Sequence, residues 1–112
     1  MSEPRLKAKV VVQSIVRRAA NRGVFATVMH SGDDDAGAIF IKIVRGRNDC
    51  TLLAPSRRPE DDKVVWVSVL KDGVIDEMAA DEHIARERRI DPDLWLVEIE
   101  DRDGWNPMAE DD

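Results

Sequence analysis

The stretch that decides the fold is Asp91-Pro-Asp-Leu-Trp-Leu-Val-Glu-Ile-Glu-Asp-Arg-Asp-Gly104. Pro92 disfavours helical backbone at the residue before it, so a preceding helix must end here. The alternation that follows places Trp95, Val97 and Ile99 on one face of a strand and glutamates on the other. The stretch therefore predicts a helix end, a half-buried strand and a charged exit.

Two helices are predicted from apolar residues spaced three to four positions apart. The first, Lys7 to Arg22, carries such a stripe and is followed by Gly23, a residue typical of the position after a helix. Its β-branched start, Val10 to Val12, also allows a short strand ahead of the helix. The second, Ile75 to Ile90, is only thinly amphipathic and ends before Pro92.

Two alternating runs, Val24 to His30 and Ala38 to Val44, bracket the turn-rich segment Gly32 to Gly37 and predict a β-hairpin. A turn centred on Asp34 fixes the register of the two strands. That register predicts that the following residues share the core face: Phe25, Thr27, Met29, Ile39, Ile41 and Ile43. The same register directs Lys42 to the other face, where we expect it to reach solvent.

Two further strands complete the expected sheet. Cys50 to Ala54 should form a third strand that stops at Pro55, which cannot donate to a ladder. Lys63 to Leu70 should form a fourth strand, rich in β-branched residues. The resulting fold class is α+β, with a mainly antiparallel five-stranded sheet in the order α-β-β-β-β-α-β and both helices packed on one face.

Composition limits the class of protein. A chain of 112 residues with 43% hydrophobic and 36% charged residues fits a single domain over 1–112, in which 103–112 form an acidic tail that is a candidate for mobility. The apolar runs are far shorter than the roughly 20 residues that cross a bilayer, and the N-terminus lacks the features of a signal peptide. We therefore expect a cytoplasmic protein without membrane contact.

Cysteine and histidine are too few for a disulfide framework or a local zinc motif, since the chain has one Cys and two His. The net charge of −6 disfavours nucleic-acid binding, because phosphate backbones attract clustered Lys and Arg. Arginines nevertheless gather at Arg17, Arg18 and Arg22 and again at Arg45 and Arg47. If the first helix lies beside the second hairpin, they converge into a patch that could bind a phosphate or an acidic partner.

Four segments carry a resemblance to a known family. They are Ala20 to Gly23, Gly32 to Lys42, Ile84 to Arg102 and Asn106-Pro107. Together they resemble a family of short bacterial proteins catalogued as a domain of unknown function, and the match spans nearly the whole chain. The residues that resemble its shared pattern include Gly32, Asp33, Asp35, Gly37, Lys42, Asp91, Pro92, Asp93, Trp95, Glu98, Glu100, Asp101 and Arg102. The resemblance implies no reaction, cofactor or ligand.

The aspartates from Asp33 to Asp35 have two interpretations. Carboxylates in one loop could bind Mg²⁺ or Ca²⁺, but the spacing matches no calcium loop, and capping of the turn's own amides explains them better. Trp105 also has two interpretations, because a large ring in a polar segment either folds back onto the domain or contacts a partner.

No catalytic, cofactor-binding or metal-binding residue is assigned, and no cofactor is expected. The candidate functional surface comprises Arg17, Arg18, Asp33, Asp35, Lys42 and Trp105. The favoured function is a noncatalytic binding or protein-interaction module, with a protein partner or self-association, while a small-molecule ligand stays open. The alternative is a small enzyme with a carboxylate-lined site near Asp33 to Asp35 and His30, which could depend on a divalent metal.

Overall fold

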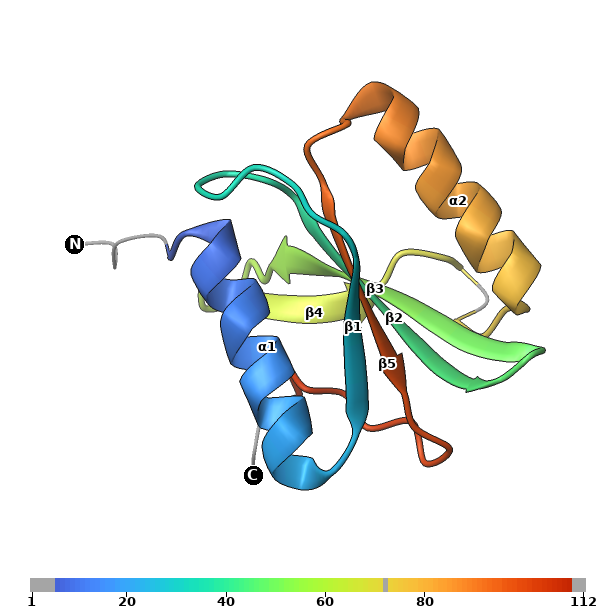
Figure 1. The fold of residues 1–112 in the computed structure, drawn as a ribbon. Helices are drawn as coiled ribbons and strands as arrows, with labels where there is room; N and C mark the ends of the chain where they lie inside the picture. Colours follow the sequence, from blue (N-terminus) through green and yellow to red (C-terminus); the bar gives the residue numbers. More distant parts are fainter. Residues whose placement is uncertain (1–5, 72, 110–112) are drawn as a thin grey trace.

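The fold is a five-stranded sheet with one helix on each side, in a computed structural model that describes residues 6–71 and 73–109 (Figure 1). Along the chain the elements follow one another as α-β-β-β-β-α-β. They are α1 (Ala8–Arg22), β1 (Phe25–His30), β2 (Ile39–Gly46), β3 (Asp49–Arg57), β4 (Val64–Ser68), α2 (Glu77–Ile90) and β5 (Trp95–Glu100). None of the helices in these residues is long and apolar enough to span a membrane.

Both helices form where the apolar spacing predicts them. α1 buries Val12, Ile15 and Ala19 along one stripe, and the valines at its start are helical. Gly23 ends it in the left-handed region, with φ of 76°, and its N–H group reaches carbonyl groups of the last turn. The side chain of Asp76 caps α2 by accepting the Ala79 N–H at 2.7 Å.

The order of strands in the sheet, β1-β5-β2-β3-β4, differs from the predicted one. β5 lies between β1 and β2, antiparallel to the first and parallel to the second, so the sheet is mixed and the predicted hairpin between β1 and β2 is wrong. Only β2, β3 and β4 form the expected meander. The reason is burial: Leu94, Trp95, Leu96 and Val97 are a continuous apolar run that must be covered on both faces, which suits a central strand.

The predicted register of β1 is also wrong. Because β5 rather than a turn at Asp34 sets the pairing, Ala26 lies opposite Ile99 and faces α1. Phe25 lies opposite Glu100 and is 77% exposed, whereas Ile41 is fully buried as predicted. Thr27 and Met29 are exposed as well.

The loop from β1 to β2 crosses the start of β5 instead of turning back on itself. The Asp33 N–H donates to the Asp93 carbonyl oxygen at 2.9 Å, and the Trp95 indole N–H donates to the Asp33 carbonyl oxygen at 2.8 Å. A Cβ at Gly32 would lie 1.9 Å from the Asp93 oxygen, and one at Gly37 would lie 2.5 Å from it. Both glycines are therefore required by this close crossing.

The helices cover opposite faces of the sheet, so the prediction that both pack on one face is wrong (Figure 1). One core contains the α1 stripe with Ile41, Val97 and Ile99. The other contains Ile84 of α2 with Leu96 and further apolar residues of β2 and β3. Apolar residues alternate onto both faces of β2 and β5, and a single helical layer would leave one face in water.

Lys42, expected to reach solvent, is only 3% exposed and lies between the sheet and α2. Its Nζ lies 2.9 Å from Glu98 of β5, 2.8 Å from Asp81 and 3.4 Å from Glu77 of α2. Burial alone would lower the pKa of Lys42, but hydrogen bonds to Asp81 and Glu98 and their negative charges raise it above its usual value. Because α2 covers this face of the sheet, Lys42 is buried and forms an ionic link between helix and sheet.

β3 runs through Pro55 to Arg57, so the prediction that this strand stops at the proline is wrong. Beyond Leu53 the strand has passed the last pair with β2 and is hydrogen-bonded to β4 alone. Proline is tolerated there because that segment has a neighbour on one side only.

Replacing Lys42 by Ala should lower the free energy of unfolding by about 2–4 kcal/mol. The reason is that the Glu98 carboxylate would stay largely buried and would lose the ammonium group that neutralises its charge. The double variant Lys42→Met/Glu98→Met should recover most of this loss. Phe25→Ala, at an exposed position, should cost well under about 1 kcal/mol. Urea denaturation compares the variants, and a larger cost for Phe25→Ala would contradict the buried ion-pair network.

Gly32→Ala should destabilise the fold by roughly 1–3 kcal/mol or more, because the added methyl group meets the Asp93 backbone. Gly46→Ala is the matched control, since nothing lies within 4 Å of a Cβ there. Thermal unfolding of both variants provides the measurement. Equal melting temperatures would show that the loop moves off β5 at no cost.

Candidate functional site

The six residues of the candidate functional surface lie in three places. Arg17 and Arg18 belong to α1, where Arg18 contacts the segment that contains Trp105, while Asp33 and Asp35 lie in the loop that crosses β5. Lys42 lies on the opposite face of the sheet, beneath α2. The structure therefore does not bring these residues into one site.

The two aspartates of the loop have structural partners. An Asp33 carboxylate oxygen accepts the N–H groups of Asp35 at 3.1 Å and Ala36 at 2.8 Å. Asp35 forms an exposed ion pair with Lys7 at 3.6 Å. These contacts agree with the capping interpretation of the loop.

His30 is not joined to these aspartates by any hydrogen bond or ion pair among residues 6–71 and 73–109. Burial, followed by the positive charge of Arg88, lowers the pKa of His30. Within the same residues, no three His, Cys, Asp or Glu side chains gather closely enough to hold a metal ion. The geometry therefore offers no support for the carboxylate-lined catalytic site.

The segment after β5 folds back onto α1, which confirms the first of the two expectations for Trp105. Its ring packs against the core on the α1 side, and the Arg22 guanidinium lies 5.2 Å from the ring centroid. Arg18 donates to the Pro107 carbonyl oxygen at 2.8 Å. Asp101 accepts the Trp105 N–H at 2.9 Å. Arg18 and Arg22 thus fasten residues 103–109; residues 110–112 of the expected tail lie outside the described part.

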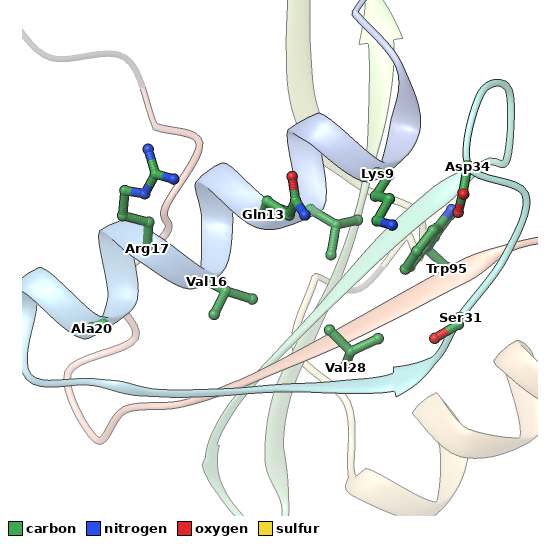
Figure 2. Close-up of a pocket in the computed structure, with 10 residues that line it drawn as sticks. Lys9, Gln13, Val16, Arg17, Ala20, Val28, Ser31, Asp34 and Trp95 are labelled. Atoms are coloured by element: carbon green, nitrogen blue, oxygen red, sulfur yellow. The ribbon is translucent and has the colours of Figure 1, made fainter.

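One concavity among the described residues is a shallow groove of about 630 Å³ between α1 and β1 (Figure 2). Its walls are largely apolar, formed by Val12, Val16 and Ala20 of α1, Val28 of β1, and Trp95. Lys9, Gln13 and Arg17 of α1 also line it, and Asp34 and Ser31 lie at the loop end. This groove lies on the face of the sheet that α1 covers, next to β1, which is an edge strand.

Sequence reasoning singled out Arg17 and the loop that contains Asp34, but it missed Lys9, Gln13 and Val28. It paired β1 with β2, and that pairing put Val28 on the wrong face and hid the edge of β1. The sequence feature that could have revealed the groove is the apolar run Leu94 to Val97. Such a run indicates a central strand, and a central β5 leaves β1 at the edge of the sheet.

Comparisons with known proteins agree with the resemblance found in the sequence. The family model described as "Protein of unknown function (DUF1491)" matches residues 6–109. The crystal structure of a DUF1491 family protein from Caulobacter crescentus CB15 is 36% identical, with a TM-score of 0.83, covering 95% of this chain and 97% of that one. An NMR structure of a DUF1491 family protein from the same organism is 37% identical, with a TM-score of 0.80 and 96% of both chains covered.

The solution structure of protein Atu0922 from A. tumefaciens is 31% identical, with a TM-score of 0.72, covering 88% of this chain and 87% of that one. Among curated proteins no match was found. The family model and the two Caulobacter structures agree over nearly the full length of the sequence. The chain belongs to the DUF1491 family of proteins of unknown function.

Proposed function

We propose that this protein is a noncatalytic protein-interaction module that binds an extended segment of a partner along the open edge of β1. The observation that carries the proposal is that β1 has a hydrogen-bonded neighbour on one side only and is largely exposed. Every second residue of such a strand directs its N–H and C=O groups away from the sheet. An extended peptide pairs with these groups by becoming an additional strand.

β1 carries none of the residue types that usually protect an edge strand against strand addition. Its sequence, Phe-Ala-Thr-Val-Met-His, contains no proline and no Lys, Arg, Asp or Glu. Natural edge strands usually carry such residues, which prevent unwanted pairing. A bulge lies between Val28 and His30, and it leaves Phe25 to Val28 in regular register. An unprotected edge of this kind is typical of a binding surface.

The groove beside β1 would add side-chain contacts, and with them specificity, to the backbone pairing. Side chains of an added strand alternate between the two faces of the sheet, so every second one would point toward α1. There they would meet Val16, Ala20 and Val28. Backbone bonds give such a complex affinity, and the groove gives it specificity.

A protein partner fits this surface better than nucleic acid. Stacking on bases requires exposed aromatic rings, and Trp95, the aromatic residue that lines the groove, is only 6% exposed. The exposed ring of β1, Phe25, is a single ring on the face opposite to the groove. The net charge of −6 also opposes long-range attraction of a polyanion. No cofactor takes part in the proposed function.

Ala20→Trp should abolish peptide binding, because the indole fills the groove from an exposed position on α1. Ala85→Trp, at an exposed position on α2, is the matched control. The probe is a pooled library of ten-residue peptides with Val, Ile or Leu at alternate positions and Asp, Glu, Ser, Thr, Lys or Arg between. The immobilised wild-type protein and control should retain peptides, and both variants should unfold within about 0.5 kcal/mol of wild type.

Hydrogen exchange then locates the bound peptide. We expect slower exchange for alternate amides of β1 and unchanged exchange in β4. Equal retention by both variants, or protection of β4 instead, would contradict the proposal. Sedimentation that shows a dimer with β1 amides already protected without peptide would assign this edge to self-association rather than to a partner.

A further inference from the structure

The rim of the groove is positively charged although the protein as a whole is acidic. α1 carries Lys9, Arg17, Arg18 and Arg22 and contains no Asp or Glu, while the net charge of the chain is −6. Arg18 and Arg22 contact the returning segment that contains Trp105 and Pro107. Lys9 and Arg17 line the groove, and neither makes an ion pair within residues 6–71 and 73–109. Two cations without an ion-pair partner in the described part of the chain therefore flank an apolar groove.

Building on the proposed function, we propose that the partner segment is an acidic extended peptide whose two carboxylates, four residues apart, pair with Lys9 and Arg17. The spacing supports this arrangement. Eight residues of α-helix span about 12 Å. Four residues of a β-strand span about 13 Å, and they carry their side chains on the same face. α1 lies alongside β1, so Lys9 and Arg17 and the two acids of an added strand would be similarly spaced along the groove (Figure 2). The Arg17 side chain points away from β1 in this view, and it would turn toward the strand on binding.

The residue midway between the two acids would point toward the same face of the sheet. There the groove presents Val16 and Val28, which favour an aliphatic side chain. The recognised pattern is therefore acid, any residue, aliphatic, any residue, acid. Side chains of the two intervening residues would point to the opposite face of the sheet.

Asp34 also lines the groove, at the loop end with Lys9 (Figure 2). Its carbonyl oxygen accepts the Lys9 N–H at 2.9 Å, and its carboxylate opposes any acid that approaches Lys9. The three charged residues of the lining still leave one net positive charge. Removing the Asp34 carboxylate should therefore strengthen binding of an acidic peptide, which is a result that a purely apolar groove would not give.

Charge also distinguishes this partner from a second copy of the chain. Two β1 strands paired antiparallel about a two-fold axis would place both α1 helices on the same face of the joined sheet. Arg17 and Lys9 of one copy would then approach the same cations of the other, and like charges oppose such contacts. An acidic segment carries charges opposite to those of Lys9 and Arg17 and would be attracted to them.

The test uses a ten-residue peptide of Thr and Val that carries two Glu residues four positions apart, with twins that carry two Gln or two Lys instead. Fluorescence anisotropy should show that the Glu peptide binds the wild-type protein about threefold to twentyfold more tightly than the Gln peptide, and that the Lys peptide binds more weakly still. Lys9→Glu/Arg17→Glu should remove the preference for Glu. Asp34→Asn should increase it, and raising the salt concentration should reduce it.

The matched control is Lys71→Glu/Arg86→Glu, which changes the net charge equally at exposed positions outside the groove and should keep the preference. Peptides from the pooled library that are retained without enrichment in Asp or Glu would overturn this inference and leave the proposed function standing. Failure to retain any peptide would overturn both. Tighter binding of a twelve-residue oligothymidine, lost in Lys9→Glu/Arg17→Glu, would assign the rim to nucleic acid instead.

Discussion

The burial of β5 on both faces is the constraint on which the rest of the structure depends. Leu96 faces the core beneath α2, while Val97 and Ile99 face the core beneath α1. A strand with this pattern is stable only in the interior of a sheet that is covered on each side. The position of the helices on opposite faces and the mixed pairing of the sheet both follow from it.

The same constraint creates the edge that we assign to partner binding. Because β5 pairs with both β1 and β2, the connection between those two strands crosses over it and cannot form a tight turn. β1 is left with one neighbour, and α1, which directly precedes it, packs over the adjoining face of the sheet. The groove is therefore a consequence of the topology and needs no separate loop to form it.

Local patterns in the sequence predicted the elements well, because the signals for helix ends and strand alternation involve neighbouring residues. Gly23, Pro92 and the alternation of Trp95, Val97 and Ile99 all have the predicted roles. Strand pairing was mispredicted because it depends on segments more than fifty residues apart, such as Phe25 and Glu100. For the candidate site, the sequence identified Arg17 as part of a basic patch, but the groove itself required knowing that β1 is an edge.

Lys42 illustrates why burial is harder to predict than alternation. It lies on the predicted face of its strand, opposite to Ile41 and Ile43, and the prediction failed only because α2 covers that face. A lysine there keeps its charge because the carboxylates of Glu98, Asp81 and Glu77 surround its ammonium group. Glu77 and Asp81 of α2 thus face the sheet in order to pair with Lys42, which partly explains why the apolar pattern of this helix is weak.

The residues that carry the family resemblance have mainly structural roles. We therefore expect other residues, those at the groove, to determine which partner is bound. Gly32, Asp33, Gly37 and Trp95 hold the loop across β5, and Lys42 with Glu98 links the sheet to α2. None of these contacts requires a particular residue at Lys9 or Arg17, whose side chains lie at the groove without fastening any described element. The fold therefore fixes the open edge, while no side-chain contact among the described residues depends on the charge of Lys9 or Arg17.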